Sequence, residues 1–406
     1  MPDQAASPTV VRQLSRRGVF EALLHKGPIS RADLSKVTGL SKQTISEVID
    51  AFEQQNLVRP IGRTSGNIGR TAVLYELSPE GGHVLGVDLG GTKLTVAIAD
   101  ISSKVLSEAT EPTHPRGGLI VLDQIAKLAN RLARDANTHP SRIRSIVVGT
   151  PGVVNPRSGA IELAPNIADF GQLDVVGLLS EKLGSTVTIE NDVNLALLGE
   201  IWHGCAQNVA DVAFIALGTG IGLGLSANGQ LVRGEHGAAG EIGYFPIGGD
   251  PFRPEVRKQG CLEYEAGAAG IIRRYLEAGG STVENVRSIF ERIELGDKTA
   301  AKIIDDTARL VALAAAIVVA TADPRLIVLG GSIGARPEFA KKVSEELSLL
   351  LSHPIEMRPS ALGNRAGVVG ALAVALSRLH EHLFGIDKLP GALPLPTPKA
   401  QLGNSG

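Results

Sequence analysis

Apolar and polar positions along the chain follow two different rhythms. Up to about residue 80, apolar residues recur at the three-to-four-residue spacing of helices, first over residues 10–26, a stretch that Gly27-Pro28 ends. From Gly81 onward, short apolar runs such as 82–100 and 145–154 alternate with polar loops and longer helical stretches, among them a buried helix expected over 305–322. This alternation is typical of α/β folds. We therefore expect a small helical head and a larger α/β portion.

The head, residues 1–80, has the local signals of a winged helix-turn-helix. Ser30 is expected to cap a short helix over 31–37 that closes at Gly39, and Ser41 is expected to cap a third helix that runs to about Gln54. Two short strands, 58–61 and 72–77, flank a basic, glycine-rich loop. Three helices followed by such a hairpin predict a winged helix.

Polar side chains at the outward positions of the third predicted helix fit a helix that enters the major groove of DNA. Glutamine pairs with adenine, lysine with guanine, and serine or threonine hydroxyls bind phosphate. Arginines beside the glycine-rich loop can approach the backbone or a narrow minor groove. The predicted DNA-binding residues are Ser41, Lys42, Gln43, Thr44, Ser46, Arg63 and Arg70. The alternative is a winged helix that contacts proteins through an ordinary solvated face.

Charge and composition support this division. Residues 1–80 carry ten Lys and Arg against eight Asp and Glu, a net charge of +2, whereas the remaining residues carry 30 against 34, a net charge of −4. The whole chain has a net charge of −2, so attraction to DNA must come from one local patch. Two cysteines make no disulfide framework, and no signal-peptide core or bilayer-spanning apolar run occurs. We expect a cytoplasmic protein without a membrane partner.

Four motifs in the α/β portion have the chemistry of phosphate and sugar binding. DLGGTK at 88–93 turns tightly after a strand and presents backbone N–H groups to an anion. ENDVN at 190–194, LGTGIG at 217–222 and GGSIG at 330–334 follow in that order. Together they resemble the two phosphate motifs, the sugar-loop aspartate and the adenosine motif of the actin-like sugar kinase fold. The predicted nucleotide-phosphate residues are Asp88, Gly90, Gly91, Thr92, Lys93, Gly218, Thr219 and Gly220.

With GTPGVV, the Pro165-Asn166 pair, GEHGAAGEIGYFPIG and KQGCLE, these motifs resemble the ROK family of repressors and sugar kinases over residues 81–385. The resemblance implies an α/β chain in which a winged helix-turn-helix precedes an actin-like ATPase (sugar kinase-like) effector domain of two lobes. We place the small lobe at 81–200, completed by about 367–385, and the large lobe at 201–366. Residues 386–406, rich in proline and glycine, are expected to be disordered.

The resemblance also implies a hexose pocket. Its predicted residues are Asn166, Asn191, Asp192, Glu241, Tyr244 and Glu263. In the family's kinases, the position of Asp192 is the base that takes the proton from the attacking hydroxyl. Two alternatives stay open: Asp192 caps the helix that begins near Asn194, and Glu241 and Glu263 are solvated loop carboxylates.

One motif departs from the family. Its members place a histidine and three cysteines around a structural zinc, but here Tyr244, Pro254 and Val256 stand at three of these positions, and only Cys261 remains. One thiolate does not make a tetrahedral zinc site, so we predict no zinc and no other cofactor. Cys261 is then a small buried hydrophobe. Residues 248–258 are ordered by proline stiffness and packing, or they stay mobile until a ligand binds.

These observations favour a transcriptional repressor of carbohydrate-metabolism genes that binds an inverted-repeat operator as a homodimer or homotetramer. A sugar or sugar phosphate in the effector domain would control it. Because DLGGTK and GTGIG are intact, an ATP-dependent hexose kinase, with or without DNA binding, is the alternative; the glycines otherwise serve the hairpin turns alone. Enzymatic activity therefore stays open. A protein-interaction scaffold with an inactive pocket is the third hypothesis.

Overall fold

A computed structural model describes residues 8–63, 71–155, 160–162 and 170–384 of the 406 residues. The chain forms two compact units. Unit 1 comprises Met1–Val148, Ile167–Ile189 and Ala371–Gly406, and unit 2 comprises Gly149–Asn166 and Glu190–Gly370. Unit 1 contains the head and a five-stranded sheet, and unit 2 contains a second five-stranded sheet. The predicted tail, residues 386–406, lies outside the described residues.

The head has three helices and a small sheet, as its sequence predicts. Its elements are α1 (Pro8–Lys26), β1 (Ile29–Ser30), α2 (Arg31–Thr38), α3 (Lys42–Gln54), β2 (Val58–Arg63) and β3 (Val73–Leu77), with strand order β1-β3-β2. The Ser30 and Ser41 hydroxyls cap α2 and α3 by accepting from Asp33 N and Thr44 N, each at 3.1 Å. Gly39 ends α2 at φ +72°, a backbone conformation that glycine adopts without strain.

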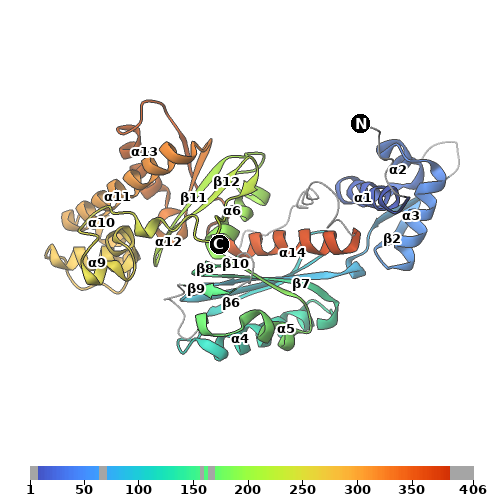
Figure 1. The fold of residues 1–406 in the computed structure, drawn as a ribbon, viewed down its shortest axis with the longest axis horizontal. Coiled ribbons are helices and arrows are strands. Elements are labelled where there is room, and N and C mark those ends of the chain that lie inside the picture. The colour runs from blue at the N-terminus through green and yellow to red at the C-terminus, as the bar shows by residue number, and fades with distance from the viewer. Residues whose placement is uncertain (1–7, 64–70, 156–159, 163–169, 385–406) are drawn as a thin grey trace. The chain divides into compact units, whose positions relative to one another are not determined.

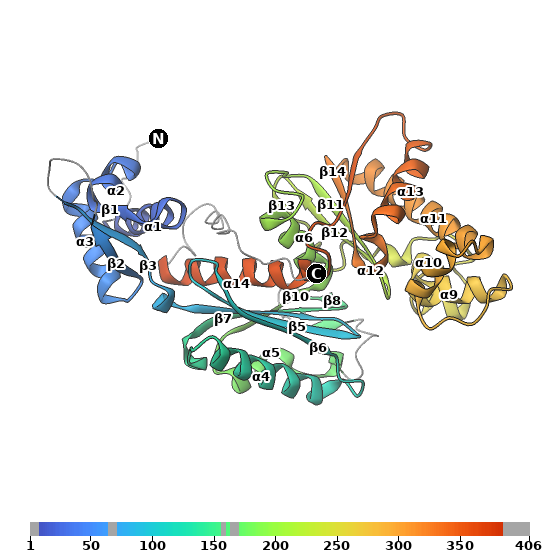
Figure 2. The same cartoon turned by 180° about the vertical axis from the view of Figure 1, so that it is seen from behind.

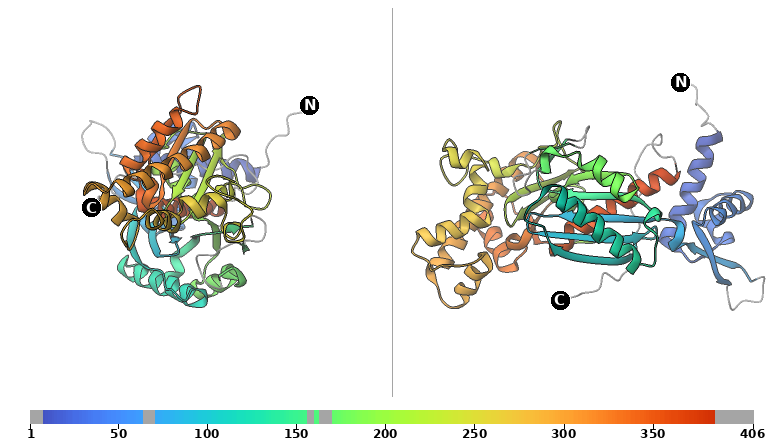
Figure 3. Two further views of the ribbon diagram at one scale, coloured as in Figure 1. Left: turned by 90° about the vertical axis from the view of Figure 1, so that its left-hand side faces the viewer. Right: turned by 90° about the horizontal axis from the view of Figure 1, so that it is seen from below.

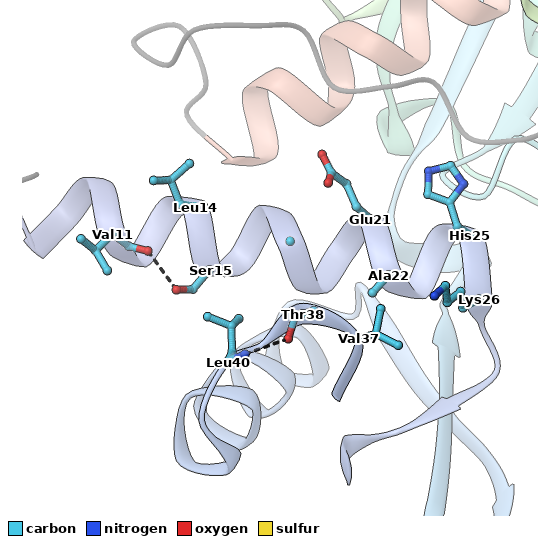
Figure 4. A pocket seen from close by; sticks show the side chains of 11 residues that line it. Val11, Leu14, Ser15, Glu21, Ala22, His25, Lys26, Val37, Thr38 and Leu40 are labelled. Atoms are coloured by element: carbon cyan, nitrogen blue, oxygen red, sulfur yellow. Dashed lines mark hydrogen bonds between the residues drawn. The ribbon is translucent and has the colours of Figure 1, made fainter. Parts of the chain in front are cut away.

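The core of the head is aromatic and aliphatic. Phe20, Leu34, Ile49 and Phe52 are fully buried, and the rings of Phe20 and Phe52 meet edge to face with centroids 6.5 Å apart. The predicted apolar stripe of α1 holds in part, because Val19 and Leu23 are buried. Leu14 is 47% exposed. It lies instead along an apolar groove of about 530 Å³ between α1 and the end of α2, whose walls include Val11, Ala22, Val37 and Leu40 (Figure 4).

The sheet of unit 1 has the strand order β10-β7-β4-β5-β6. Its strands are β4 (His83–Leu89), β5 (Lys93–Asp100), β6 (Val105–Pro112), β7 (Ile143–Thr150) and β10 (Val187–Asn191). Helices α4 (Gly118–Asp135) and α5 (Val175–Leu183) cover one face, and α14 (Ala366–Phe384) lies along the other (Figures 1 and 3). Short 3-10 helices occur at η1 (Pro79–Gly81), η2 (Pro140–Arg142) and η3 (Phe170–Gln172).

The sheet of unit 2 has the order β13-β12-β11-β14-β15, and β8 pairs with β9 separately. Figure 2 shows β11, β12, β13 and β14 of this sheet. The strands are β8 (Val153–Val154), β9 (Ile161–Glu162), β11 (Val212–Leu217), β12 (Ile221–Ala227), β13 (Gln230–Leu231), β14 (Leu326–Gly330) and β15 (Glu356–Pro359). The helices are α6 (Asp192–His203), α7 (Pro254–Arg257), α8 (Cys261–Ala266), α9 (Ala268–Glu277), α10 (Val286–Glu294), α11 (Lys298–Ala322), α12 (Gly331–Gly334) and α13 (Pro337–Ser348), with η4 (Ile242–Tyr244) and η5 (Gly363–Arg365).

The two sheets share one topology. In each, the first three strands run antiparallel as neighbours, the fourth pairs with the first, and the fifth lies beyond the fourth. Alternate residues of β11 face opposite layers, as the two-residue period of a strand requires. Ala213, Ile215 and Leu217 join the core that α11 and α13 cover, whereas Val212 and Phe214 join a smaller core under α6. This repeated plan is the two-lobed α/β architecture that the sequence predicts.

Helix α11 begins earlier than its sequence indicates. It starts at Lys298, capped by Asp297 Oδ1, which accepts from Ala300 N at 3.0 Å, and not at Asp305 as expected. The first two turns carry exposed or half-exposed polar residues beside buried Ile303 and Ile304, so the uninterrupted apolar run marks only the later part. None of the helices in the described ranges combines the length and apolarity that crossing a bilayer requires.

Helix α14 carries a histidine into the core of unit 1. The His380 ring is fully buried against Phe20 of α1, with ring centroids 4.8 Å apart. Neither ring nitrogen has a hydrogen-bond partner of good geometry among the described residues. Burial therefore lowers the pKa of His380 to about 4, and the nearby backbone of Ile101 opposes this shift only in part.

This environment predicts an acid-sensitive contact. The pKa of His380 is lower in the folded than in the unfolded chain, so stability is complete above pH 6.5 and falls as the pH drops toward about 4. The full loss amounts to about 3 kcal/mol, from about 1.4 kcal/mol per pKa unit. His380→Leu should raise the melting temperature at pH 5 more than at pH 8. His382→Leu, at an exposed position of the same helix, should show no such pH dependence; equal shifts for both variants would contradict the assignment.

Candidate functional site

The candidate site begins where β10 passes into α6. Asn191 caps α6, because its Oδ1 accepts from Val193 N and Asn194 N, both at 3.0 Å. Its Nδ2 donates to Gly152 O at 3.0 Å, so both polar ends of the amide hold backbone. Asp192 is the first residue of the helix and accepts from Val193 N at 2.9 Å. The alternative in which Asp192 is the cap is thus wrong: Asn191 has that role.

Glu190 lies on the other side of Asn191 and is almost fully hydrogen-bonded. Its Oε1 accepts from Asn191 N at 3.0 Å and from Asn194 Nδ2 at 3.1 Å. Its Oε2 accepts from Arg233, at 2.8 Å from Nε and 2.7 Å from Nη2. Arg233 was not among the predicted residues, because it lies 43 positions from Glu190 and just outside the GEHGAAGEIGYFPIG stretch. This ion pair neutralises Glu190 and holds the loop after β13 against the start of α6.

Three carboxylates form what we call the acidic cluster: Asp192, Glu241 and Glu263. Burial raises the pKa of Asp192 to about 6, against the opposing hydrogen bond from Val193. The pKa of Glu241 is raised first by burial and then by the charges of Glu263 and Asp192. The pKa of Tyr244 is raised by burial and by the charges of Glu241 and Glu263. The structure therefore brings together five of the six residues predicted to bind sugar at the start of α6: these four and Asn191.

Glycines set the approach of the segments that carry Glu241 and Glu263. A side chain at Gly240, where φ is +98°, would place its Cβ 1.9 Å from Leu223 O of β12. A side chain at Gly260, where φ is +91°, would place its Cβ 2.3 Å from Gly243 O. Only glycine fits such contacts. The segment of Glu241 is thereby held on β12, and the start of α8, which carries Glu263, is held on the same segment.

The second phosphate motif is the turn between β11 and β12. Gly218 N donates to Gly220 O at 2.9 Å, and Ala268 N donates to Gly218 O at 3.1 Å. The Glu263 carboxylate rests on this turn: Ile221 N donates to its Oε2 at 3.0 Å, and a Cβ at Gly220 would lie 2.3 Å from the same oxygen. Thr219 is exposed. The predicted phosphate loop and the acidic cluster are thus in direct contact.

The first phosphate motif is the turn between β4 and β5, in unit 1. Gly90 N donates to Lys93 O at 2.8 Å, while Thr113 donates to Gly90 O through its hydroxyl at 2.7 Å and to Thr92 O through its backbone N–H at 3.1 Å. Gly91 and Thr92 are exposed, and Asp88 and Lys93 are half-buried. The turn is tight, as predicted, and its tip faces solvent.

The residues at the family's zinc positions do not fit a metal ion. Val256 is 2% exposed in α7, which Pro254 begins, and neither side chain has a donor atom for a metal. Cys261 is buried and its Sγ lies 3.3 Å from Ile247 O. Tyr244 is 45% exposed. No group of three or more His, Cys, Asp or Glu suited to a metal occurs within residues 8–384 where the structure describes them.

Some of the predicted DNA-binding residues are exposed, and others have hydrogen-bond partners within the head. Lys42 and Gln43 are exposed in the first turn of α3. Ser41 and Thr44 are joined by the cap of that helix. Ser46 accepts from Arg31 Nη1 at 2.7 Å, and Arg31 also binds Asp50 at 2.6 Å. Ser46 therefore has a structural partner that the sequence did not reveal, because Arg31 lies on another helix.

Arg63 is exposed at the end of β2. Arg70 in the wing loop and Asn166 of the predicted sugar pocket lie outside the described residues. The DNA-binding and sugar-binding assignments both stay predictions at the level of single residues.

Comparison with known proteins gives consistent matches. The model of the ROK family matches residues 84–378. A xylose repressor from Bacillus spizizenii is 25% identical over 389 residues, which cover 95% of this chain and 99% of that protein. A glucokinase from Halalkalibacterium halodurans is 30% identical over 310 residues, or 70% of this chain and 92% of that protein. A crystal structure of a ROK family transcriptional regulator, a homolog of the E. coli MLC protein, is 24% identical with a TM-score of 0.72, covering 93% of this chain and 98% of that one.

The raised pKa of Asp192 generates a test. Because this pKa is higher in the folded than in the unfolded chain, ionisation of Asp192 lowers stability as the pH rises from about 4 to about 6. Asp192→Asn should therefore raise the melting temperature at pH 7.5. The corresponding gain in the free energy of unfolding is at most about 3 kcal/mol and should vanish near pH 4.

The matched control is Asp174→Asn, an exposed N-cap of α5 where asparagine caps equally well. Its melting temperature should stay close to that of the unaltered protein at every pH. A destabilising Asp192→Asn at pH 7.5 would show that the carboxylate makes a favourable contact in the unliganded protein.

Proposed function

The chain belongs to the ROK family, and from this premise we propose that it is a DNA-binding transcriptional repressor of carbohydrate-metabolism genes controlled by a neutral sugar. The observation that carries the proposal is the three-helix head with its β2-β3 hairpin, in which Lys42 and Gln43 are exposed at the capped start of α3. An enzyme that only phosphorylates sugars has no use for such a domain.

The comparisons support the regulator over the kinase. The xylose repressor matches 95% of the chain, which necessarily includes most of the head, whereas the glucokinase matches 70%. The head is thus shared with relatives that are named repressors. The proposed operator is an inverted repeat bound by a homodimer, with half-sites about one helical turn apart.

The charges of unit 2 favour an unphosphorylated effector. Asp192, Glu241 and Glu263 already repel one another, and the phenol of Tyr244 beside them is neutral near pH 7. Arg233 is paired with Glu190. A phosphate dianion would add two negative charges to this environment. Sugar hydroxyls donate to carboxylates without such a cost, and each carboxylate can accept from two neighbouring hydroxyls.

A hexose kinase is the second candidate, because one observation favours it. Asp192 has a pKa near 6 at the start of α6, close to the range in which a carboxylate works as a general base at neutral pH. A coupled assay with ATP and a panel of hexoses separates the two functions. We expect no turnover above background; turnover that Asp192→Asn abolishes would replace the repressor proposal by the kinase.

The head predicts a specific response to mutation. A consensus duplex selected from a random DNA library should bind the full chain in the nanomolar range typical of specific operators. Lys42→Ala should weaken binding to all sequences and reduce the slope of log K against log salt by about one, whereas Gln43→Ala should cost about 1–3 kcal/mol at one base pair. Lys104→Ala, an exposed lysine outside the head, is the control and should leave affinity unchanged. Failure to select any duplex would contradict the proposal.

The acidic cluster predicts which ligands bind. In a thermal-shift series at pH 7.5, neutral pentoses and hexoses should include at least one that stabilises the chain, by about 2.7 kcal/mol at a hundredfold excess over its Kd. The 6-phosphate or 5-phosphate of the same sugar should give a smaller shift at equal concentration. Glu241→Gln should reduce the shift with the neutral sugar. A phosphate ester that stabilises more strongly than its parent sugar would reject the neutral-effector part of the proposal while leaving DNA binding intact.

A further inference from the structure

Helices α6 and α14 touch through their backbones at one pair of glycines. A methyl group at Gly370 of α14 would lie 1.8 Å from Leu195 O and 3.0 Å from Gly199 N of α6. A methyl group at Gly199 would lie 2.3 Å from Ala366 O and 3.1 Å from Gly370 N. No side chain fits at either position, so neither helix can shift at this crossing without moving the other.

A buried carboxylate beside the crossing ties α6 to the start of α14. Glu200 is fully buried and accepts from Cys205 N at 2.8 Å and from Leu362 N at 2.9 Å. It also accepts from the Ser360 hydroxyl. Residues 360–362 lead through η5 directly into α14. Glu200 therefore positions the segment from which α14 begins, and the two helices act as one rigid piece in unit 2.

The same rigid piece reaches the candidate site. Helix α6 has 12 residues, so it is about 18 Å long. Its first residue is Asp192 of the acidic cluster, and its last turns carry Gly199 and Glu200. One end of α6 thus lies in the candidate site and the other at the crossing with α14.

The far end of α14 touches the head, within unit 1. The His380 ring meets the Phe20 ring of α1 at a centroid distance of 4.8 Å, and Phe20 meets Phe52 of α3 at 6.5 Å. All three side chains are fully buried. A methyl group at Gly82, just after the wing hairpin, would lie 3.4 Å from Leu379 of α14. Helix α3, which carries Lys42 and Gln43, is therefore two aromatic contacts from α14.

We propose that α14 transmits ligand binding from the acidic cluster to the recognition helix, through the Gly199–Gly370 crossing and Glu200 at one end and the His380–Phe20 contact at the other. Helix α14 is continuous from Ala366 to Phe384, its first residues belong to unit 2, and the rest belong to unit 1. The inference rests on the proposed function for the identity of its ligand. Its mechanical part, the coupling from α6 through α14 to the head, does not depend on that function. Glu200 acts in it as a positioning residue, because it is fully buried and binds protein groups.

The mechanical part is tested without any ligand, by hydrogen exchange of the full chain. Glu200→Gln weakens the anchor of α14 and should speed amide exchange in α1 and α3 about fivefold or more, a coupling of the size typical between linked sites. Helix α4, in the same unit as the head, serves as the internal reference and should not change. Glu345→Gln, an exposed carboxylate of α13, is the control variant and should leave the head unchanged.

A second pair of variants tests whether the coupling passes through the contact between His380 and Phe20. In a His380→Ala background, Glu200→Gln should no longer alter exchange in α1 and α3, although exchange in α6 still rises. If Glu200→Gln prevents folding, Ser360→Ala removes one hydrogen bond to the same carboxylate and takes its place. An unchanged head with Glu200→Gln, or an equal change with and without His380, would overturn the proposal.

A second arm uses D-xylose and D-glucose as probes, with DNA affinity and thermal shift measured on the same samples. His380→Ala should keep the thermal shift that a sugar causes and lose most of the sugar-dependent change in DNA affinity. A full sugar-dependent change in DNA affinity with His380→Ala would contradict transmission through α14. Absence of any thermal shift with either sugar would count against the effector proposal alone, because the exchange experiment still decides the transmission.

Discussion

The arrangement depends on one helix, α6, that has a buried or half-buried carboxylate at each end. Asp192 at its start is raised in pKa by burial, and Glu200 near its end is fully buried. Burying a charge without hydrogen bonds is expensive, so each end of the helix needs partners. At the Glu200 end, backbone N–H groups and the Ser360 hydroxyl supply them. At the Asp192 end the described residues supply the Val193 N–H, and Asp192 lies close enough to Glu241 for its charge to raise the pKa of that carboxyl.

The number of protein hydrogen-bond donors around a carboxylate distinguishes structural from ligand-binding carboxylates better than residue type does. Glu190 and Glu200 bind several protein donors each, and Glu190 also binds Arg233. Asp192 and Glu241 have pKa values raised by burial, and Glu241 also by its acidic neighbours. A group left in this state is favoured to bind a donor from outside, and sugar hydroxyls are such donors. Val256 and Cys261 are buried by apolar packing. A structural metal at their positions would need several thiolates.

Local signals made most of the head predictable. Ser30, Gly39 and Ser41 mark helix ends through contacts that span three or four residues, and the sequence displays such contacts directly. The acidic cluster was predictable only through the ordered motifs of the resemblance, because Asp192 and Glu263 are 71 positions apart in the chain. Contacts between residues far apart in the chain could not be predicted from the sequence. The bond between Arg31 and Ser46 and the crossing of Gly199 with Gly370 depend on how helices pack, which hydrophobic periodicity does not encode. The start of α11 was missed because its polar first turns hide the helical spacing.

A sugar site of this kind serves catalysis or regulation according to where its binding energy goes. A kinase gains rate only from contacts that strengthen in the transition state, whereas a regulator needs contacts that strengthen in one conformation of the ground state. Raising the population of one conformation from 1% to 99% requires a ligand that binds it more tightly than the other conformation by about 5.5 kcal/mol. Hydroxyls that bind two or three desolvated carboxylates are of the right strength for this task. The proposed coupling through α6 and α14 would turn that energy into a displacement at Phe20, and an enzyme without a head has no use for such a displacement.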